Sequence, residues 1–237
     1  RDVINKGVAT QDLLETAAAA YAAGWQSIKL YFMIGLPTET DEDVMGIARL
    51  TREVLATRGN RGGGRVNVSV AGFVPKAHTP FQWEAQASRE ELVRKQQLLK
   101  TALRDRRVEY GWHDAGMSVL EAAFARGDRR LGDVLVKAYR LGCRFDAWSE
   151  SFAWARWHEA FAACRQDPGF YAQRSREAGE VFPWSHLISG VEQAFLWQER
   201  LRAYAGAATA DCRWAPCPGC GICSNLGASV LLREASS

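Results

Sequence analysis

Residues 27–40 read SIKLYFMIGLPTET, a nearly continuous apolar run followed by a glycine, a proline and several polar residues. An apolar run with β-branched and aromatic residues is typical of a strand buried on both faces, as in a parallel sheet. Thr40 with Asp43 three residues later suits a capping box, so a helix is expected to begin near Asp41. The segment therefore predicts a strand over residues 27–35, a turn, and then a helix.

Helices and strands alternate on both sides of this segment. Residues 10–24, TQDLLETAAAAYAAG, predict a helix capped by Thr10 and ended by Gly24. Residues 65–75, RVNVSVAGFVP, predict a second strand with three valines on one face and a small or polar set on the other, namely Asn67, Ser69 and Ala71. A helix capped by Ser88 and running to about residue 106, and a short strand over 107–114, follow. This order predicts a parallel sheet with right-handed crossovers, hence an α/β fold class.

Beyond residue 115 the pattern becomes mainly helical. Residues 116–205 contain no convincing strand, and Gly127-Asp128 indicates a break at which the glycine ends one helix and Asp128 caps the next. The chain closes with a cysteine-rich loop and a short polar tail. We expect three parts: an α/β part over residues 1–115, a helical domain over 116–210, and a four-cysteine metal loop and tail over 211–237.

The composition is that of an ordered soluble protein. Hydrophobic residues make up 47% of the chain and charged residues 24%, which excludes global disorder. A formal charge of +3 is too small to indicate nucleic acid by itself, and the apolar runs are too short for a membrane span, so no membrane partner is expected. Six cysteines, four of them crowded together, favour metal ligands in a reducing compartment over disulfides, which predicts a cytoplasmic location.

Several segments carry a resemblance to known enzymes. FMIGLPTET (32–40) resembles the fifth-strand segment of radical S-adenosylmethionine (radical SAM) enzymes, in which an apolar strand ends in a G-L-P-x-E-T turn. FVPKAHTPFQW (73–83) resembles the sixth-strand segment of members that often carry a cobalamin-binding domain. EAAFARGDRR, FDAW, PWSHL and DCRWAPCPGCGIC, all downstream, are similar to an incompletely characterised family of cobalamin-type radical SAM proteins, so the likeness covers nearly the whole chain.

The resemblance implies a C-terminal half of a partial (β/α) radical SAM barrel followed by the helical domain. The C-x3-C-x2-C loop that binds the catalytic [4Fe–4S] cluster of such enzymes is absent from the sequence. We therefore interpret the chain as a fragment of a longer enzyme, inactive alone and partnered by its missing N-terminal half. The intact protein is expected to cleave S-adenosylmethionine reductively, or to drive cobalamin-dependent methyl transfer, on a small-molecule or RNA substrate.

The resemblance also assigns cofactor contacts at two strand ends. Met33 corresponds to an apolar side chain that meets the adenine, and Gly35 lets the backbone pass close to the cofactor. Phe73 and Val74 would contact the same adenosyl group. Ligands of such sheets bind at the carboxyl ends of strands, which agrees with these positions. Tyr31 departs from the pattern, because the family often has a glycine there. No residue is expected to be an acid–base catalyst.

Lys76 and His78 follow the second strand and are candidate substrate-binding residues. A lysine and a histidine at the rim of a lumen could bind a carboxylate or phosphate, whereas the alternative is an ordinary solvated loop. His113, at the end of the third strand, has a similar case.

Four thiols lie within residues 211–225, at Cys212, Cys217, Cys220 and Cys223. Thiolates bind zinc and iron–sulfur clusters, and the continuous C-x2-C-x2-C spacing is closer to that of ferredoxins. Gly219 and Gly221 permit tight turns that let backbone N–H groups face the sulfurs. The spacing leaves three alternatives open, an auxiliary iron–sulfur cluster, a structural zinc ion and no metal. A second function class is a non-catalytic module in which a zinc knuckle and basic, tryptophan-rich helices bind nucleic acid.

Two further groups have structural interpretations. Arg126, Asp128, Arg129 and Arg130 are read as a solvated face with Asp128 as a cap, or alternatively as a grip on phosphate. Four aromatic residues and one cysteine mostly recur at spacings of three to five and are predicted to pack a helix into a core: Trp148, Phe152, Trp157, Phe161 and Cys164.

Overall fold

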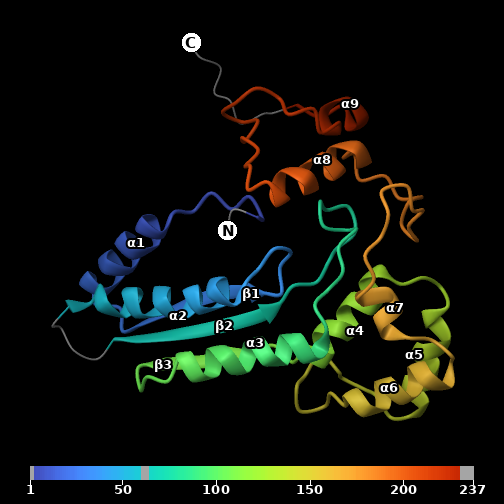
Figure 1. Ribbon diagram of the computed structural model, residues 1–237, viewed down its shortest axis with the longest axis horizontal. Helices are drawn as coiled ribbons and strands as arrows, with labels where there is room; N and C mark the ends of the chain where they lie inside the picture. The colour runs from blue at the N-terminus through green and yellow to red at the C-terminus, as the bar shows by residue number, and fades with distance from the viewer. Residues whose placement is uncertain (1–2, 60–63, 230–237) are drawn as a thin grey trace.

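The computed structural model describes residues 3–59 and 64–229. Its first half alternates helix and strand as the sequence predicts (Figure 1). The elements are α1 (Thr10–Ala22), β1 (Ser27–Ile34), α2 (Asp41–Ala56), β2 (Arg65–Gly72), α3 (Arg89–Ala102) and β3 (Val108–Trp112). The second half is helical, with α4 (Ala115–Arg126), α5 (Leu131–Arg140), α6 (Trp154–Ala163), α7 (Pro168–Ala172), α8 (Gln193–Tyr204) and α9 (Ile222–Leu226). The fold is mixed α/β.

The three strands form an open parallel sheet in the order β1-β2-β3. Strand β2 lies between the other two, and its register pairs Ala71 with Met33 of β1. The helix cap predicted from the sequence is confirmed, because the Thr40 side chain accepts from the backbone N–H of Asp43 and the Asp43 carboxylate accepts from that of Thr40. Ser88 caps α3 through the N–H of Glu91, as predicted.

Some predicted boundaries are wrong by a few residues. Thr10 is the first residue of α1, and Ala9 precedes it as the N-cap. Strand β2 ends at Gly72 instead of residue 75; Pro75 has no N–H to continue a ladder. Helix α3 ends at Ala102 instead of 106, and the chain turns where the Asp105 carboxylate accepts from the backbone N–H of Arg107.

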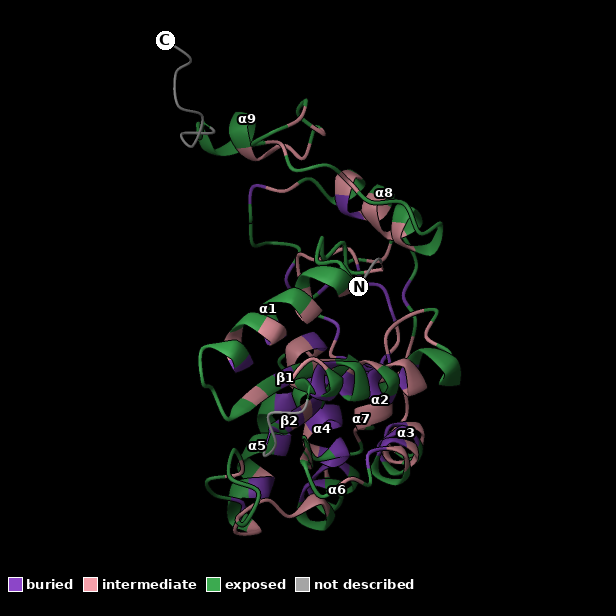
Figure 2. Cartoon of the chain, turned by 90° about the vertical axis from the view of Figure 1, so that its left-hand side faces the viewer, coloured by how far each residue is buried: buried purple, intermediate pink, exposed green. Residues whose placement is uncertain are grey.

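One face of the sheet makes the main core. Apolar side chains of all three strands pack against α1, α2 and α3 on this face, including Leu30, Ile34, Val66, Val68 and Val70. Buried residues alternate with more exposed ones along most of β2, in agreement with the predicted period of two. Figure 2 shows buried residues gathered around β2, α2 and α4, whereas α1 is largely exposed. The opposite face is open, since Tyr31 is 71% exposed and Met33 is 42% exposed. The prediction that this strand is buried on both faces is therefore wrong, because the helices of the described chain cover only one face of the sheet.

Helices α4 to α7 gather at one end of the sheet around a second apolar cluster (Figure 1). Trp157 and Phe161 are buried in this cluster, and Phe152 and Cys164 pack against it, as predicted. The prediction for Trp148 is wrong, because its side chain is 63% exposed. It precedes α6 in a turn, where the helical spacing that motivated the prediction does not apply.

The break between α4 and α5 also differs from the sequence-based interpretation. Arg130, not Asp128, is the N-cap of α5, and the Asp128 carboxylate instead accepts from the backbone N–H of Arg130 at 2.9 Å. Gly127 has an extended backbone. The arginines are not all solvated, because Arg126 is 1% exposed.

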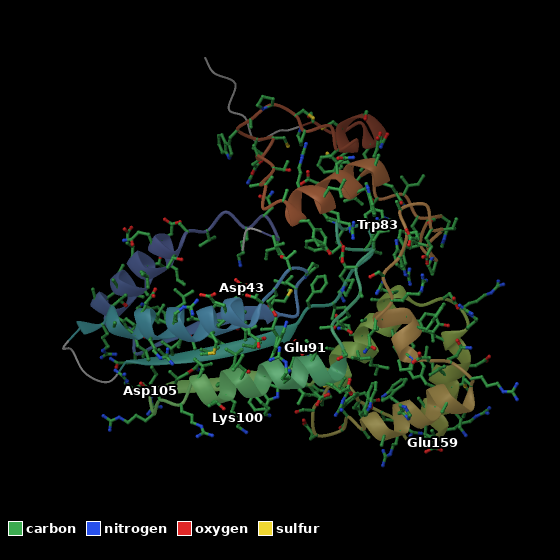
Figure 3. All side chains as sticks on the ribbon, viewed as in Figure 1. Asp43, Trp83, Glu91, Lys100, Asp105 and Glu159 are labelled. Atoms are coloured by element: carbon green, nitrogen blue, oxygen red, sulfur yellow. The ribbon has the colours of Figure 1, made fainter. Side chains whose placement is uncertain are left out.

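Helix α8 packs against the loop between β2 and α3. Trp83, labelled in Figure 3, lies beneath α8 with its ring 5.1 Å from that of Trp197. The Glu84 carboxylate pairs with Arg200 and accepts from the Tyr204 hydroxyl at 2.8 Å. Burial and this hydrogen bond raise the pKa of Tyr204. Among the described residues, no helix has both the length and the apolar character needed to cross a bilayer.

Candidate functional site

The carboxyl ends of β1 and β2 lie side by side and continue into two loops. Ile34 pairs with Gly72 in the ladder, and the backbone N–H of Phe73 then donates to the Ile34 carbonyl at 2.8 Å. Gly35 follows with a φ of +80°, a left-handed conformation that a side chain strains. The two loops that carry the predicted cofactor residues are thereby held together at one edge of the sheet.

A buried ion pair holds the Gly35 turn against α3. The Glu39 carboxylate accepts from the backbone N–H of Gly35 at 2.7 Å and from the Lys95 ammonium at 2.7 Å. The Glu39 and Lys95 side chains are 8% and 7% exposed. Glu91, labelled in Figure 3, is a second carboxylate 3.6 Å from the same ammonium. Neither Glu39 nor Lys95 was predicted to be a functional residue from the sequence, although Glu39 belongs to the G-L-P-x-E-T turn.

Met33 lies on the open face of the sheet, one residue before the end of β1. On the same face, Lys29 places its ammonium 4.9 Å from the Tyr31 ring centroid. Asn67 and Ser69 of β2 also belong to this face and are half-buried. The open face thus presents a thioether, an aromatic ring and polar groups side by side.

The side chains of Phe73 and Val74 pack inside the protein and not on the open face of the sheet. Phe73 is buried with its ring edge-on to Phe81, 5.8 Å between centroids. Val74 packs against the apolar cluster of α4 and α7. Their side chains are occupied by internal packing, so Met33 and the backbone around Gly35 and Phe73 are the parts of the predicted cofactor set that gather at the strand ends.

The predicted substrate residues lie in the loop after β2. Lys76 is exposed and forms an ion pair with Glu121 of α4. His78 has a φ of +56°, and its backbone N–H donates to the Gln82 side-chain carbonyl at 3.2 Å. His113, after β3, places Nδ1 3.1 Å from the Ser118 hydroxyl oxygen. Each of the three residues has a local protein partner.

The cysteines lie beyond α8. Cys212 and Cys220 are half-buried, Cys217 and Cys223 are exposed, and all four are free thiols. Cys223 belongs to the short helix α9 and so lies outside the loop proper. The Cys220 carbonyl accepts from the backbone N–H of Glu192, which ties the segment to the start of α8.

Thiolate sulfurs are suitable ligands for a thiophilic metal, but the four cysteine side chains of this segment are not gathered around one point. The backbone N–H of Gly219 donates to the Cys217 sulfur at 3.4 Å, and Gly219 and Gly221 adopt positive φ angles, which glycine tolerates without strain. Within residues 3–59 and 64–229, no three His, Cys, Asp or Glu side chains converge closely enough to hold a metal ion. Residues 230–237 of the predicted tail lie outside the described residues.

Comparison with known proteins identifies a relative without an assigned activity. An uncharacterised protein of the archaeon Methanocaldococcus jannaschii is 30% identical over 137 residues, which is 57% of this chain. The matched region is 29% of the length of that protein. No model of a known protein family matches the sequence. No solved structure matches it either.

Proposed function

We propose that the chain is part of a radical SAM iron–sulfur enzyme, in which it contributes one wall of the S-adenosylmethionine pocket and an auxiliary metal site. The observation that carries the proposal is the junction at the ends of β1 and β2. Gly35 with its positive φ, the exposed Met33 and the backbone of Phe73 lie together there. The carboxyl ends of parallel strands are where such folds bind ligands.

In this proposal the sheet is the C-terminal half of a (β/α) barrel. Its open face, with Lys29, Met33 and Ser69, would line the lumen, while the face packed on α1 to α3 is the outer layer. The proposal assigns the C-x3-C-x2-C loop and its catalytic [4Fe–4S] cluster to a part of the protein outside this chain, together with any cobalamin-binding domain. The match to 29% of a longer relative is consistent with this assignment.

The residues of this chain would bind and orient the cofactor. When bound, the catalytic cluster and S-adenosylmethionine supply the radical chemistry, and the protein supplies position. The Met33 thioether offers a polarisable apolar surface to the adenine. Gly35 lets the turn pack closely on α3, because a Cβ at this position would lie 3.0 Å from Leu92 Cδ2. The buried Glu39–Lys95 pair keeps the turn in place. Lys76 and His78 are assigned to the substrate rim.

The four cysteines would hold an auxiliary cluster in this proposal. The Gly219 N–H that donates to the Cys217 sulfur and the left-handed glycines support thiolate ligation. Holding a single metal group would require the sulfurs to close together from the arrangement described here. A zinc ion in the same ligands is the competing occupant.

Metal content tests the proposal. The chain should be reconstituted anaerobically with iron and sulfide, or separately with zinc, and then desalted. We expect iron and acid-labile sulfide in equal amounts and a brown chromophore. Cys217→Ser should abolish the uptake, whereas Cys143→Ser, at a buried thiol within the helical cluster, should leave it unchanged.

Two outcomes would contradict the proposal. One is stoichiometric zinc without iron uptake, together with RNA binding that weakens as salt rises; this result would favour the nucleic-acid-binding module. The other is no metal uptake under either condition.

A further inference from the structure

Two buried arginines lie where α4 ends. Arg126 is 1% exposed and Arg176 is 7% exposed, although arginine is almost never buried without a charged partner. Arg126 is the last residue of α4, and Arg176 lies shortly after α7. Helices α4 and α7 pack directly against each other, so the two side chains share one region.

Backbone carbonyls hold both guanidinium groups in place. Arg126 donates to the carbonyls of Ala172 at 2.6 Å and Arg174 at 3.0 Å. Arg176 donates from its side chain to the Arg126 carbonyl at 2.8 Å, and from its backbone N–H to the Trp83 carbonyl at 2.8 Å. Carbonyl groups orient the guanidinium forks but leave their positive charges uncompensated.

The nearby carboxylates are too few for the arginines around them. Glu180 forms two hydrogen bonds with Arg174 and a longer ion pair with Arg176, 3.8 Å from its Nε, so one negative charge is shared between two arginines. Glu84 is paired with Arg200. Arg126, Arg174, Arg176 and Arg200 together carry four positive charges, whereas Glu84 and Glu180 carry two negative charges. Two positive charges are therefore left uncompensated.

Asp128, two residues after Arg126 in the sequence, is paired with Arg130. Within the described part of the chain, Arg126 forms no ion pair. Burial and repulsion from Arg176 and Arg174 lower the pKa of Arg126 to about 10. Burial also lowers the pKa of Arg176.

Several N–H groups in this region lack an acceptor. They are Nε of Arg126, Nε and Nη1 of Arg176, and Nε of Arg174. Two neighbouring side chains of the loop after β2 also have buried, unpartnered donors, at Gln82 Nε2 and Trp83 Nε1. The Arg176 guanidinium lies 5.3 Å and 5.2 Å from the ring centroids of Phe182 and Trp184, which stack on each other. The region is thus rich in buried donors and in positive charge.

We propose that Arg126 and Arg176 form a binding site for a tetrahedral dianion of the phosphate class, either free phosphate or the phosphate group of a larger ligand. A dianion matches the two uncompensated charges, and its acceptor oxygens match the surplus of N–H donors. The proposal does not depend on a radical SAM assignment.

The site is linked to the β2 end of the sheet. The Gln86 backbone N–H donates to the Ala172 carbonyl that also accepts from Arg126, and its side-chain amide donates to the Phe73 carbonyl at 3.0 Å. Occupation of the site would therefore stabilise the loop that follows β2.

Thermal unfolding of the full chain tests the proposal. Sodium phosphate is compared with sodium chloride at equal ionic strength, after dialysis into a buffer free of phosphate and sulfate. At a hundred-fold excess over the dissociation constant we expect Tm to rise by at least about 5 °C in phosphate relative to chloride. Ribose 5-phosphate is the second probe. A larger rise with it than with phosphate assigns the site to a phosphorylated ligand, and a rise with phosphate alone assigns it to the free ion.

Variants separate this site from general attraction to a basic surface. Arg176→Met, and Arg126→Lys, which keeps the charge but removes the fork, should each weaken phosphate binding by about ten-fold or more. Arg130→Met is the matched control: Arg130 is exposed and paired with Asp128, and phosphate binding should be unchanged.

Three results would overturn the proposal: no phosphate-specific shift in the unmodified chain, an unchanged shift in both site variants, or an equal loss in Arg130→Met. The first measurement decides the question even where a variant does not fold.

Discussion

Replacing Lys95 by methionine tests whether the turn after β1 depends on its buried ion pair. The substitution keeps most of the side-chain volume but removes the ammonium that lies 2.7 Å from the Glu39 carboxylate. Glu39 would keep the Gly35 N–H as a donor, yet its charge would remain buried without a counter-ion. Because both side chains are less than one-tenth exposed, the cost of breaking the pair is about 3–5 kcal/mol. The variant should therefore unfold at a Tm about 10 °C lower.

Urea unfolding followed by circular dichroism measures this loss, and a double-mutant cycle isolates the pair. Glu39→Gln retains a carbonyl that can accept from Gly35. The double variant, Glu39→Gln with Lys95→Met, should therefore lose less stability than the sum of the two single losses. Arg94→Met is the control on the same helix, because Arg94 pairs with Asp41 and Glu91 at the exposed surface and its loss should change stability little.

Two results would refute this reasoning. One is a loss below about 1 kcal/mol in Lys95→Met, which is the range of an exposed pair. The other is strict additivity in the cycle, since that would mean that Glu39 and Lys95 contribute independently.

Two further predictions concern the strain at Gly35 and the pH dependence of stability. Gly35→Ala should lower the unfolding free energy by about 1–3 kcal/mol because of the φ of +80° at this position, and by more because the new Cβ contacts Leu92. Gly24→Ala, at φ +93° with no neighbour within 4 Å, is the control in the same urea titration. An equal loss of stability at both sites would mean that the contact with Leu92 contributes nothing. A hydrogen bond with Thr40 lowers the pKa of Asp43, and one with Arg107 lowers the pKa of Asp105 to about 2. The stability that these two carboxylates contribute is fully present above the ordinary carboxyl pKa range and is lost as the pH falls from about 4 toward 2. An unfolding free energy that stays constant over this pH range would contradict the prediction.

Local signals in the sequence were sufficient for the order of elements in the α/β part. The caps at Thr40 and Ser88 involve groups three residues apart, so their chemistry can be read directly from adjacent residues. The valines of β2 alternate with polar residues because a strand places successive side chains on opposite faces. In each of these features the residues involved are separated by fewer residues than one helix or strand contains.

Features that depend on which elements meet were not predictable in the same way. Glu39 and Lys95 are far apart in sequence and meet only because α3 packs against the turn after β1. Trp148 has a spacing that suits a helical core, but it lies in a turn before α6 and is exposed. The aromatic spacing did not show where the helix would begin.

The sequence was thus enough to predict the alternation of helices and strands, the caps at Thr40 and Ser88 and the buried face of β2, because these follow from periodicity and from bonds between near neighbours. The tertiary structure decided which charges are buried. Arg126 looks like a surface residue in a run of arginines, and only the packing of α4 against α7 removes it from water and places it beside Arg176. Desolvation and charge pairing depend on everything that surrounds a group, and that surrounding exists only in the folded chain.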